Sequence, residues 1–155
     1  MLIEKLAGRI DELGADELDH MHIEFVRLQE EDLRKPVQRV TSDHGHEYGL
    51  RLPRGTVLLN GDILHRDTHG IVVIQVASTR VIVIAPVSMA QMGRVAHALG
   101  NRHMPAQFTT GTDGTAQMIV PDDHTTVAYL QHESVPFAQE ERVLDEPFHH
   151  AEHTH

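Results

Sequence analysis

Histidine is the residue type whose positions in this chain point most directly to chemistry. His103 follows a Leu-Gly-Asn-Arg segment at the end of a helix-like pattern, and His149, His150, His153 and His155 lie close together at the end of the sequence. Imidazole nitrogen binds divalent nickel, copper and zinc. The chain has no cysteine, so it lacks the thiolates that favour copper(I) or close a structural zinc site. These residue types predict a site of nitrogen and oxygen ligands that holds a divalent metal reversibly.

Composition excludes several other classes of protein. The chain has 155 residues, of which 40% are hydrophobic, so it can form one domain or two small ones. A formal charge of −10 and an aromatic content of 4% argue against a nucleic-acid-binding surface. The first dozen residues include acidic side chains and no continuous apolar run, so neither a secretory signal nor a membrane span is expected there. We therefore expect a cytoplasmic protein that binds neither nucleic acid nor membrane.

Short strand-like runs dominate the first half of the sequence. We expect strands at 21–28, 37–40, 48–52, 56–59 and 71–77. Turn compositions that contain glycine or asparagine separate them, and residues 30–35 could form a helical turn before Pro36. This pattern predicts a small all-β domain over residues 1–77.

The second half alternates strands with helices. Ser88 is a candidate N-cap for a helix that ends near Gly100-Asn101, and its methionines, Met89 and Met92, are expected in the core. Strands are expected at 80–85, 106–110, 116–120 and 135–138, with a second helix from Asp122 or Asp123 to about Gln131. The order βαββαβ predicts a ferredoxin-like domain over residues 78–144. Residues 145–155 have too little apolar content to fold alone, which predicts a mobile histidine-rich tail on an α+β protein.

Three sequence strings together resemble a known family. They are Leu-Gly-Asn-Arg-His-Met-Pro at 99–105, Leu-Pro-Arg-Gly at 52–55 and Gly-Asp-Ile-Leu at 61–64. In this order the chain resembles the urease accessory protein UreE family, the nickel metallochaperones of urease maturation, over about residues 20–138. The resemblance implies a homodimer that delivers Ni²⁺ to apo-urease and works with the accessory GTPase UreG. It also implies that the β-rich domain is similar to a peptide-binding domain.

The same resemblance implies a set of metal ligands. His103 corresponds to the histidine whose two copies share one nickel near the dimer axis. Further ligands in some relatives come from the start of the second helix, here His124, and from the tail, here His149, His150, His153 and His155. Pro121, Asp122 and Asp123 precede His124 where some relatives carry two nearby histidines, so aspartate oxygens are alternative ligands. The Irving–Williams order predicts that Zn²⁺ or Cu²⁺ competes in vitro.

Other interpretations of the histidines stay open. The chain has none of the motifs HExxH, GxSxG or GxxxxGK[ST], so we expect no enzyme. The alternatives are a cupin-like metal-dependent enzyme that uses His44 and His46, and a metal buffer or sensor based on the tail. We expect His20 and His22 to share one face of a strand. These two histidines, with His44, His46, His65 and His69, are interpreted as exposed polar residues without an assigned role.

Overall fold

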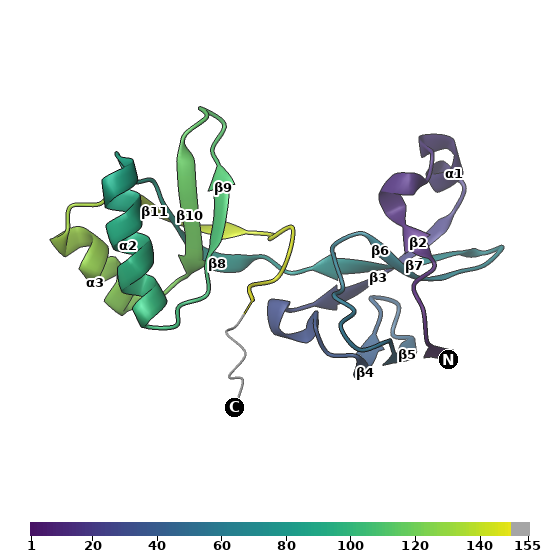
Figure 1. Cartoon of the computed structure of the whole chain (residues 1–155). Helices are drawn as coiled ribbons and strands as arrows, with labels where there is room; N and C mark the ends of the chain where they lie inside the picture. The colour runs from purple at the N-terminus through teal and green to yellow at the C-terminus, as the bar shows by residue number, and fades with distance from the viewer. Residues whose placement is uncertain (150–155) are drawn as a thin grey trace. The chain divides into compact units, whose positions relative to one another are not determined.

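The chain folds into two units in the computed structural model, which describes residues 1–149 (Figure 1). The N-terminal unit comprises Met1–Ala77 and the short segment Asp145–Pro147. The C-terminal unit comprises Ser78–Leu144 and the described residues that follow Pro147. Within residues 1–149, no helix combines the length and the hydrophobicity that crossing a membrane requires.

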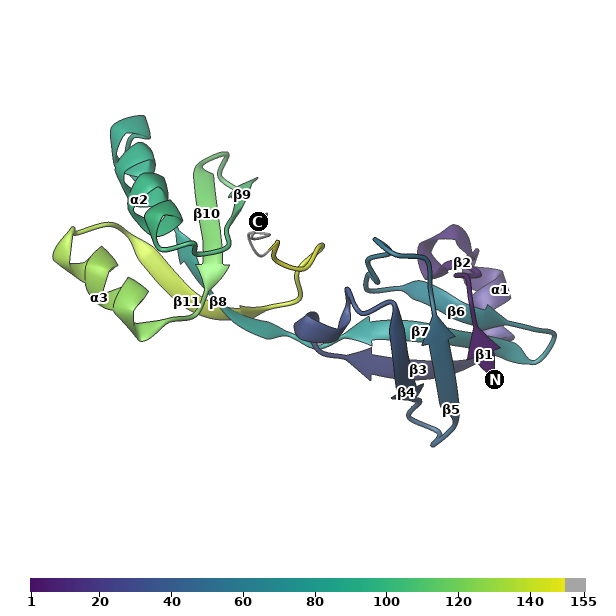
Figure 2. The same ribbon diagram turned by 60° about the horizontal axis from the view of Figure 1, so that its bottom comes forward.

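Strands dominate the N-terminal unit. In chain order they are β1 (Leu2–Ile3), β2 (Gly8–Arg9), β3 (His22–Leu28), β4 (Val37–Thr41), β5 (Glu47–Arg51), β6 (Asp62–Arg66) and β7 (Gly70–Val76). They form a three-stranded sheet in the order β1-β5-β4 and a four-stranded sheet in the order β2-β6-β7-β3 (Figure 2). The unit also contains a short helix, α1 (Ala15–Asp19), which was not expected, and 3₁₀ turns at Ile10–Glu12 and Glu30–Asp32.

The central strand β7 is buried on both of its faces. Val72, Ile74 and Val76 belong to one hydrophobic cluster, which also contains side chains of β4 and β5 from the other sheet. Ile71 and Val73 belong to a second cluster, which packs against the chain around α1. Because successive side chains of a strand point to opposite faces, β7 joins the two clusters through one stretch of backbone.

In the N-terminal unit, one expected strand is absent and three strands were not expected. Residues 56–59 form no strand, because Thr56 instead closes a turn in which its N and Oγ1 donate to Pro53 O at 3.1 and 2.7 Å. Leu58 N then donates to Leu33 O at 2.8 Å, so this backbone is satisfied without a sheet partner. The strands that were not expected are β6, which begins directly after the turn expected at Asn60 and Gly61, and the two-residue strands β1 and β2.

The C-terminal unit alternates strands and helices. Its elements are β8 (Thr79–Ile84), α2 (Met89–Asn101), β9 (Gln107–Thr110), β10 (Ala116–Pro121), α3 (His124–His132) and β11 (Phe137–Arg142). The sheet order is β11-β8-β10-β9, and every neighbouring pair is antiparallel. The sequence predicted a strand or a helix at each of these places, with boundaries that differ by a few residues.

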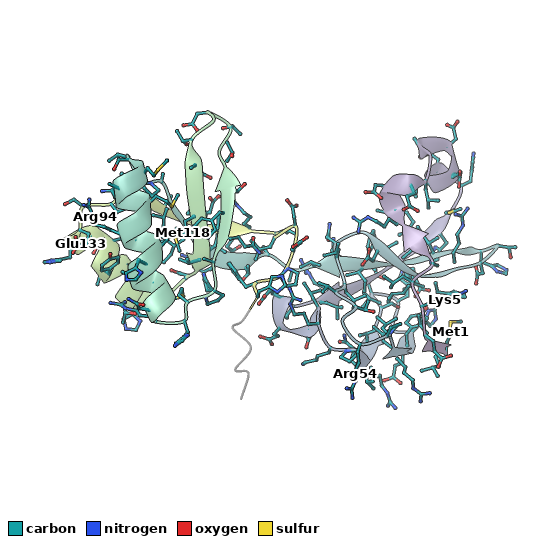
Figure 3. The ribbon with its side chains drawn as sticks, viewed as in Figure 1. Met1, Lys5, Arg54, Arg94, Met118 and Glu133 are labelled. Carbon is teal, nitrogen blue, oxygen red and sulfur yellow. The ribbon has the colours of Figure 1, made fainter. Side chains whose placement is uncertain are left out.

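Each face of the C-terminal sheet carries its own cluster of apolar side chains. Met118 of β10 packs with Val95 and Leu99 of α2, whereas Arg94 on the same helix is exposed (Figure 3). The opposite face contains Ile119 and the buried Phe148, from the segment expected to be a mobile tail. The expectation that Met89 is in the core is wrong. Met89 is 91% exposed. It is the first residue of α2, and packing of this helix against the cluster begins only one turn later, at Met92.

Candidate metal centres

The local backbone at the end of α2 determines where His103 lies. Ser88 caps the start of the helix by accepting a hydrogen bond from Gln91 N at 3.1 Å, as the sequence predicted. At the other end, His103 N donates to Gly100 O at 3.0 Å and Met104 N donates to Leu99 O at 3.1 Å. This pair of hydrogen bonds is the Schellman motif, which satisfies the last carbonyl groups of a helix.

His103 occupies the position of that motif at which glycine is usual. Its φ angle is 57°, in the left-handed region that side chains with a Cβ rarely adopt. The next residue, Met104, packs with Leu99 in the helix-covered cluster, so the backbone on the C-terminal side of His103 is anchored. The His103 side chain itself is exposed. A non-glycine residue kept in a strained conformation is a reason to look for function at that residue.

His124 is placed by the cap of the next helix. It is the first residue of α3, and its side chain is 96% exposed. Asp123 caps α3, because its Oδ2 accepts hydrogen bonds from Thr126 N at 3.0 Å and from Thr126 Oγ1 at 2.9 Å. Hydrogen bonds from Thr125 and Thr126 stabilise the carboxylate and lower the pKa of Asp123 to about 2.

The aspartates that precede His124 are engaged by protein groups. Asp122 accepts hydrogen bonds from Gln139 Nε2 at 2.8 Å and from Arg80 Nε at 3.1 Å, and these contacts hold its pKa below the ordinary value. Asp123 is the helix cap, and one of its oxygens lies 4.0 Å from His124 Nδ1. Both aspartates therefore already have a structural role in the fold.

The remaining expected ligands are at the end of the chain. His149 is exposed, and His150, His153 and His155 lie outside the described residues. Within residues 1–149, no group of three potential metal ligands forms around His103, His124 or His149. A single copy of the described chain therefore brings together too few side chains at these places for a complete site.

The described residues do bring together three potential ligands elsewhere, in the N-terminal unit. His22, Glu24 and His44 each offer a ligand atom, and these atoms all lie within 4.8 Å of one another. Neither histidine was expected to have a functional role. His20 was expected on a strand with His22, whereas it is the C-cap residue that follows α1. The signal that could have identified this group is the spacing of His22 and Glu24 on one face of a strand.

Comparison with known proteins places the chain in a family. Residues 3–77 match the model described as "UreE urease accessory protein, N-terminal domain". The urease accessory protein UreE of Actinomyces naeslundii is 48% identical to this chain over the full length of both. The chain belongs to the UreE family. The UreE protein of Staphylococcus carnosus is 40% identical, with the alignment covering all of this chain and 99% of that protein. The resemblance inferred from the His103 motif is thus confirmed, and these UreE relatives are named accessory proteins rather than enzymes.

Proposed function

We propose that this chain is a nickel metallochaperone of urease maturation, which binds Ni²⁺ as cargo and delivers it to apo-urease. The observation that carries the proposal is His103, held at positive φ at the end of α2 in a chain whose full-length relatives are urease accessory proteins. In the proposed pathway the chain works in the cytoplasm with the GTPase UreG. The accessory names of the relatives favour this role over a cupin-like enzyme based on His44 and His46.

The proposed site lies at a two-fold axis between two copies of the chain. A side chain beside such an axis occurs twice, so one His103 per chain supplies two imidazole ligands. Metal that binds only the pair also stabilises the dimer. Two imidazoles leave coordination positions open, and His124 or the tail histidines are the candidates to fill them. Ligands that are exposed and few in number suit a protein that must release its metal to a partner.

An exposed aromatic side chain supports the proposed dimer. Phe108 lies on β9, five residues after His103, and is 63% exposed. The strand β9 is at the edge of its sheet, whose order β11-β8-β10-β9 is the one we propose to be ferredoxin-like. A large apolar side chain on an edge strand is a feature that a partner chain would cover.

The test is a calorimetric titration with Ni²⁺ at neutral pH. The protein is a chain that ends at Phe148, so that the tail histidines are absent while the buried Phe148 is kept. We expect one binding phase with a stoichiometry of about one nickel per two chains, and we expect His103→Asn to abolish this phase. Asparagine tolerates the left-handed conformation, so this variant removes the imidazole with little change to the backbone.

The matched control is His97→Gln, which removes an exposed histidine from within α2. It should bind nickel as the unmodified truncated chain does. Unchanged binding in His103→Asn would show that the main site is elsewhere and would overturn the assignment of His103.

A further inference from the structure

A second cluster of ligand side chains begins on β3 of the N-terminal unit. His22 and Glu24 are two residues apart, so they lie on the same face of the strand. Glu24 is only 8% exposed, and its face is the one on which Val26 and Leu28 enter the core. The backbones of β3 and β7 approach each other closely at Gly70, which pairs with His22. A Cβ added at Gly70 would lie only 2.0 Å from His22 O, so a larger residue would not fit there. This end of β3 is thus a firm support for its two ligands.

The turn between β4 and β5 brings His44 to the same place. Asp43 N donates to Phe25 O at 2.8 Å, and Phe25 N donates to Asp43 Oδ1 at 2.9 Å, so the turn is bonded to β3 in both directions. Within the turn, Ser42 Oγ accepts hydrogen bonds from the backbone nitrogens of His44 and His46, each at 3.3 Å. The position of His44 beside β3 is therefore determined by backbone contacts and not by its side chain alone.

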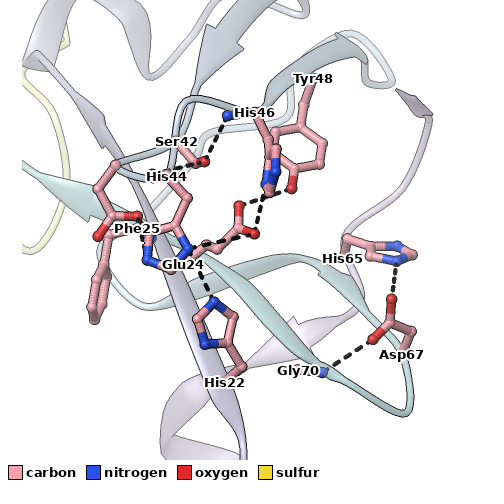
Figure 4. Close-up of polar contacts among 11 residues, drawn as sticks. His22, Glu24, Phe25, Ser42, His44, His46, Tyr48, His65, Asp67 and Gly70 are labelled. Atoms are coloured by element: carbon pink, nitrogen blue, oxygen red, sulfur yellow. Dashed lines mark hydrogen bonds and ion pairs between the residues drawn. The ribbon is translucent and has the colours of Figure 1, made fainter.

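The three ligand atoms have a separation that suits one ion. His22 Nε2 and His44 Nδ1 are 3.0 Å apart, and His44 Nδ1 lies 3.9 Å from Glu24 Oε1 (Figure 4). Two ligands about 2.0–2.1 Å from a metal ion are roughly 2.8–3.4 Å apart when they are adjacent in octahedral or tetrahedral geometry. The two imidazoles already have this separation, and a small movement of the carboxylate would complete a set of three ligands.

Neighbouring groups keep the carboxylate of Glu24 charged. Burial alone would raise its pKa, but hydrogen bonds from Ser42, His46 and Tyr48 outweigh this effect and hold the pKa below its ordinary value. His46 Nδ1 lies 2.8 Å from Glu24 Oε1, and Tyr48 Oη donates to Glu24 Oε2 at 3.0 Å. Burial and the adjacent carboxylate raise the pKa of Tyr48 to about 12, so the phenol remains a neutral donor. Partners of this kind orient metal-binding carboxylates in proteins.

Two of the three ligand residues, His22 and Glu24, line a cavity that has room for water. The cavity has a volume of about 210 Å³, and its polar lining includes His22, Glu24, His46, Tyr48, His65 and Asp67. The lining is rich in imidazole and carboxylate, which are ligands for first-row transition ions. An ion held by the cluster would face this cavity at His22 and Glu24, where water could complete its coordination.

We propose that His22, Glu24 and His44 form a binding site for a divalent first-row transition ion, Ni²⁺ or Zn²⁺, in the N-terminal unit. The site is separate from His103 and does not depend on the proposed function of that residue. Two imidazole nitrogens with one carboxylate oxygen favour these ions over Mg²⁺ and Ca²⁺, which prefer oxygen ligands alone. The exposed side of the site leaves positions for water or for a ligand from another molecule.

The test is amide NMR of the full-length chain, because this method observes the proposed site while other histidines also bind metal. Ni²⁺ is paramagnetic, so we expect it to broaden the signals of residues 22–24 and 43–46 as it is added. Zn²⁺ should shift the same signals and provide the dissociation constant. We expect His44→Gln to weaken Zn²⁺ binding at this site by more than about 100-fold, since even outer partners of metal ligands contribute about 10- to 100-fold.

The matched control is His20→Gln, which removes an exposed histidine near the site that is not part of the cluster. It should leave the broadening of both segments unchanged. Glu24→Gln, which keeps the shape of the side chain, is a second variant for the case that His44→Gln alters the fold, and it should also weaken binding. If residues 22–24 and 43–46 do not respond to saturating Ni²⁺ or Zn²⁺, or if both variants bind as the unmodified chain does, the proposal is wrong. The signals around His103 report separately on the proposed chaperone site.

Discussion

At the scale of single residues, the proposed role of His103 needs an imidazole, whereas its backbone conformation favours glycine. The Schellman motif at the end of α2 favours glycine at this position, because glycine adopts positive φ without strain. The chain has histidine there instead, at φ 57°. If the imidazole is retained for metal binding, the protein keeps it at some cost in conformational stability.

Replacement of His103 by glycine should therefore make the fold more stable and remove the proposed metal ligand. In the metal-free protein, we expect His103→Gly to raise the free energy of unfolding by about 0.5 kcal/mol, because the strain of positive φ is relieved. The same variant should no longer bind nickel at the proposed dimer site. Urea denaturation in the presence of a chelator measures the first effect, and calorimetry measures the second.

His97→Gly provides the comparison, because it introduces the same residue inside α2. Glycine within a helix lowers stability by about 1 kcal/mol, so the two substitutions should have opposite signs. A loss of stability in His103→Gly similar to that in His97→Gly would contradict the interpretation of His103 as a strained residue.

At the scale of elements, the caps of the helices could be predicted from the sequence because their signals are local. Ser88 marks the start of α2 correctly, and the helix ends at Asn101 as expected, but the left-handed residue that closes it is His103 and not Gly100. The grouping of His22, Glu24 and His44 could not be predicted in this way. It depends on the parallel pairing of β3 with β7 and on hydrogen bonds between the β4–β5 turn and β3, which join segments distant in sequence. The prediction of a strand at 56–59 was wrong for a similar reason, because the backbone nitrogen of Leu58 bonds to Leu33 O, which is distant in sequence.

The cap of α3 predicts how stability depends on pH. The pKa of Asp123 is about 2 in the folded chain, below the ordinary value of 3.8, so the ionised cap stabilises the folded state. This contribution is present above about pH 5 and is lost as the pH falls from there towards 2. Asp123→Asn keeps a capping oxygen but has no charge to titrate. We expect the unmodified chain to lose more stability than Asp123→Asn between pH 5 and pH 2, as measured by urea denaturation.

Asp123→Ala removes both the capping oxygen and the charge, so comparison with Asp123→Asn separates the two contributions. At pH 7 it should lower the free energy of unfolding by about 1 kcal/mol, the usual contribution of an N-cap side chain. Equal pH dependence in the unmodified chain and in Asp123→Asn would mean that this carboxylate does not contribute to the acid sensitivity of the fold.

At the scale of the whole molecule, the proposed function requires two copies of the chain. The C-terminal unit offers exposed apolar side chains at Val87, Met89 and Phe108. Of these, Phe108 lies nearest in sequence to His103. A dimer axis beside His103 would therefore bring Phe108 close to the partner chain.

We expect Phe108→Ser to weaken the dimer. Removal of a buried phenylalanine from an interface costs about 1.5–3 kcal/mol, and a two-fold dimer loses two of them. The dissociation constant should therefore rise by at least roughly 100-fold. Analytical ultracentrifugation over a range of concentrations measures this constant. Val37→Ser is the control, because Val37 is also exposed, at 69%, but lies on β4 of the N-terminal unit. If Phe108→Ser associates as tightly as the control, the dimer forms through another surface.

The position of β7 has a consequence for how the N-terminal unit unfolds. Its backbone carries side chains of both hydrophobic clusters, so neither cluster can open fully while the other keeps this strand in place. The two clusters therefore behave as one cooperative unit and not as two independently melting layers. The last register pair of this strand with β3 is Leu28 with Val76, and the first is His22 with Gly70. The end of β3 that carries His22 and Glu24 is thus paired with a strand that belongs to both clusters.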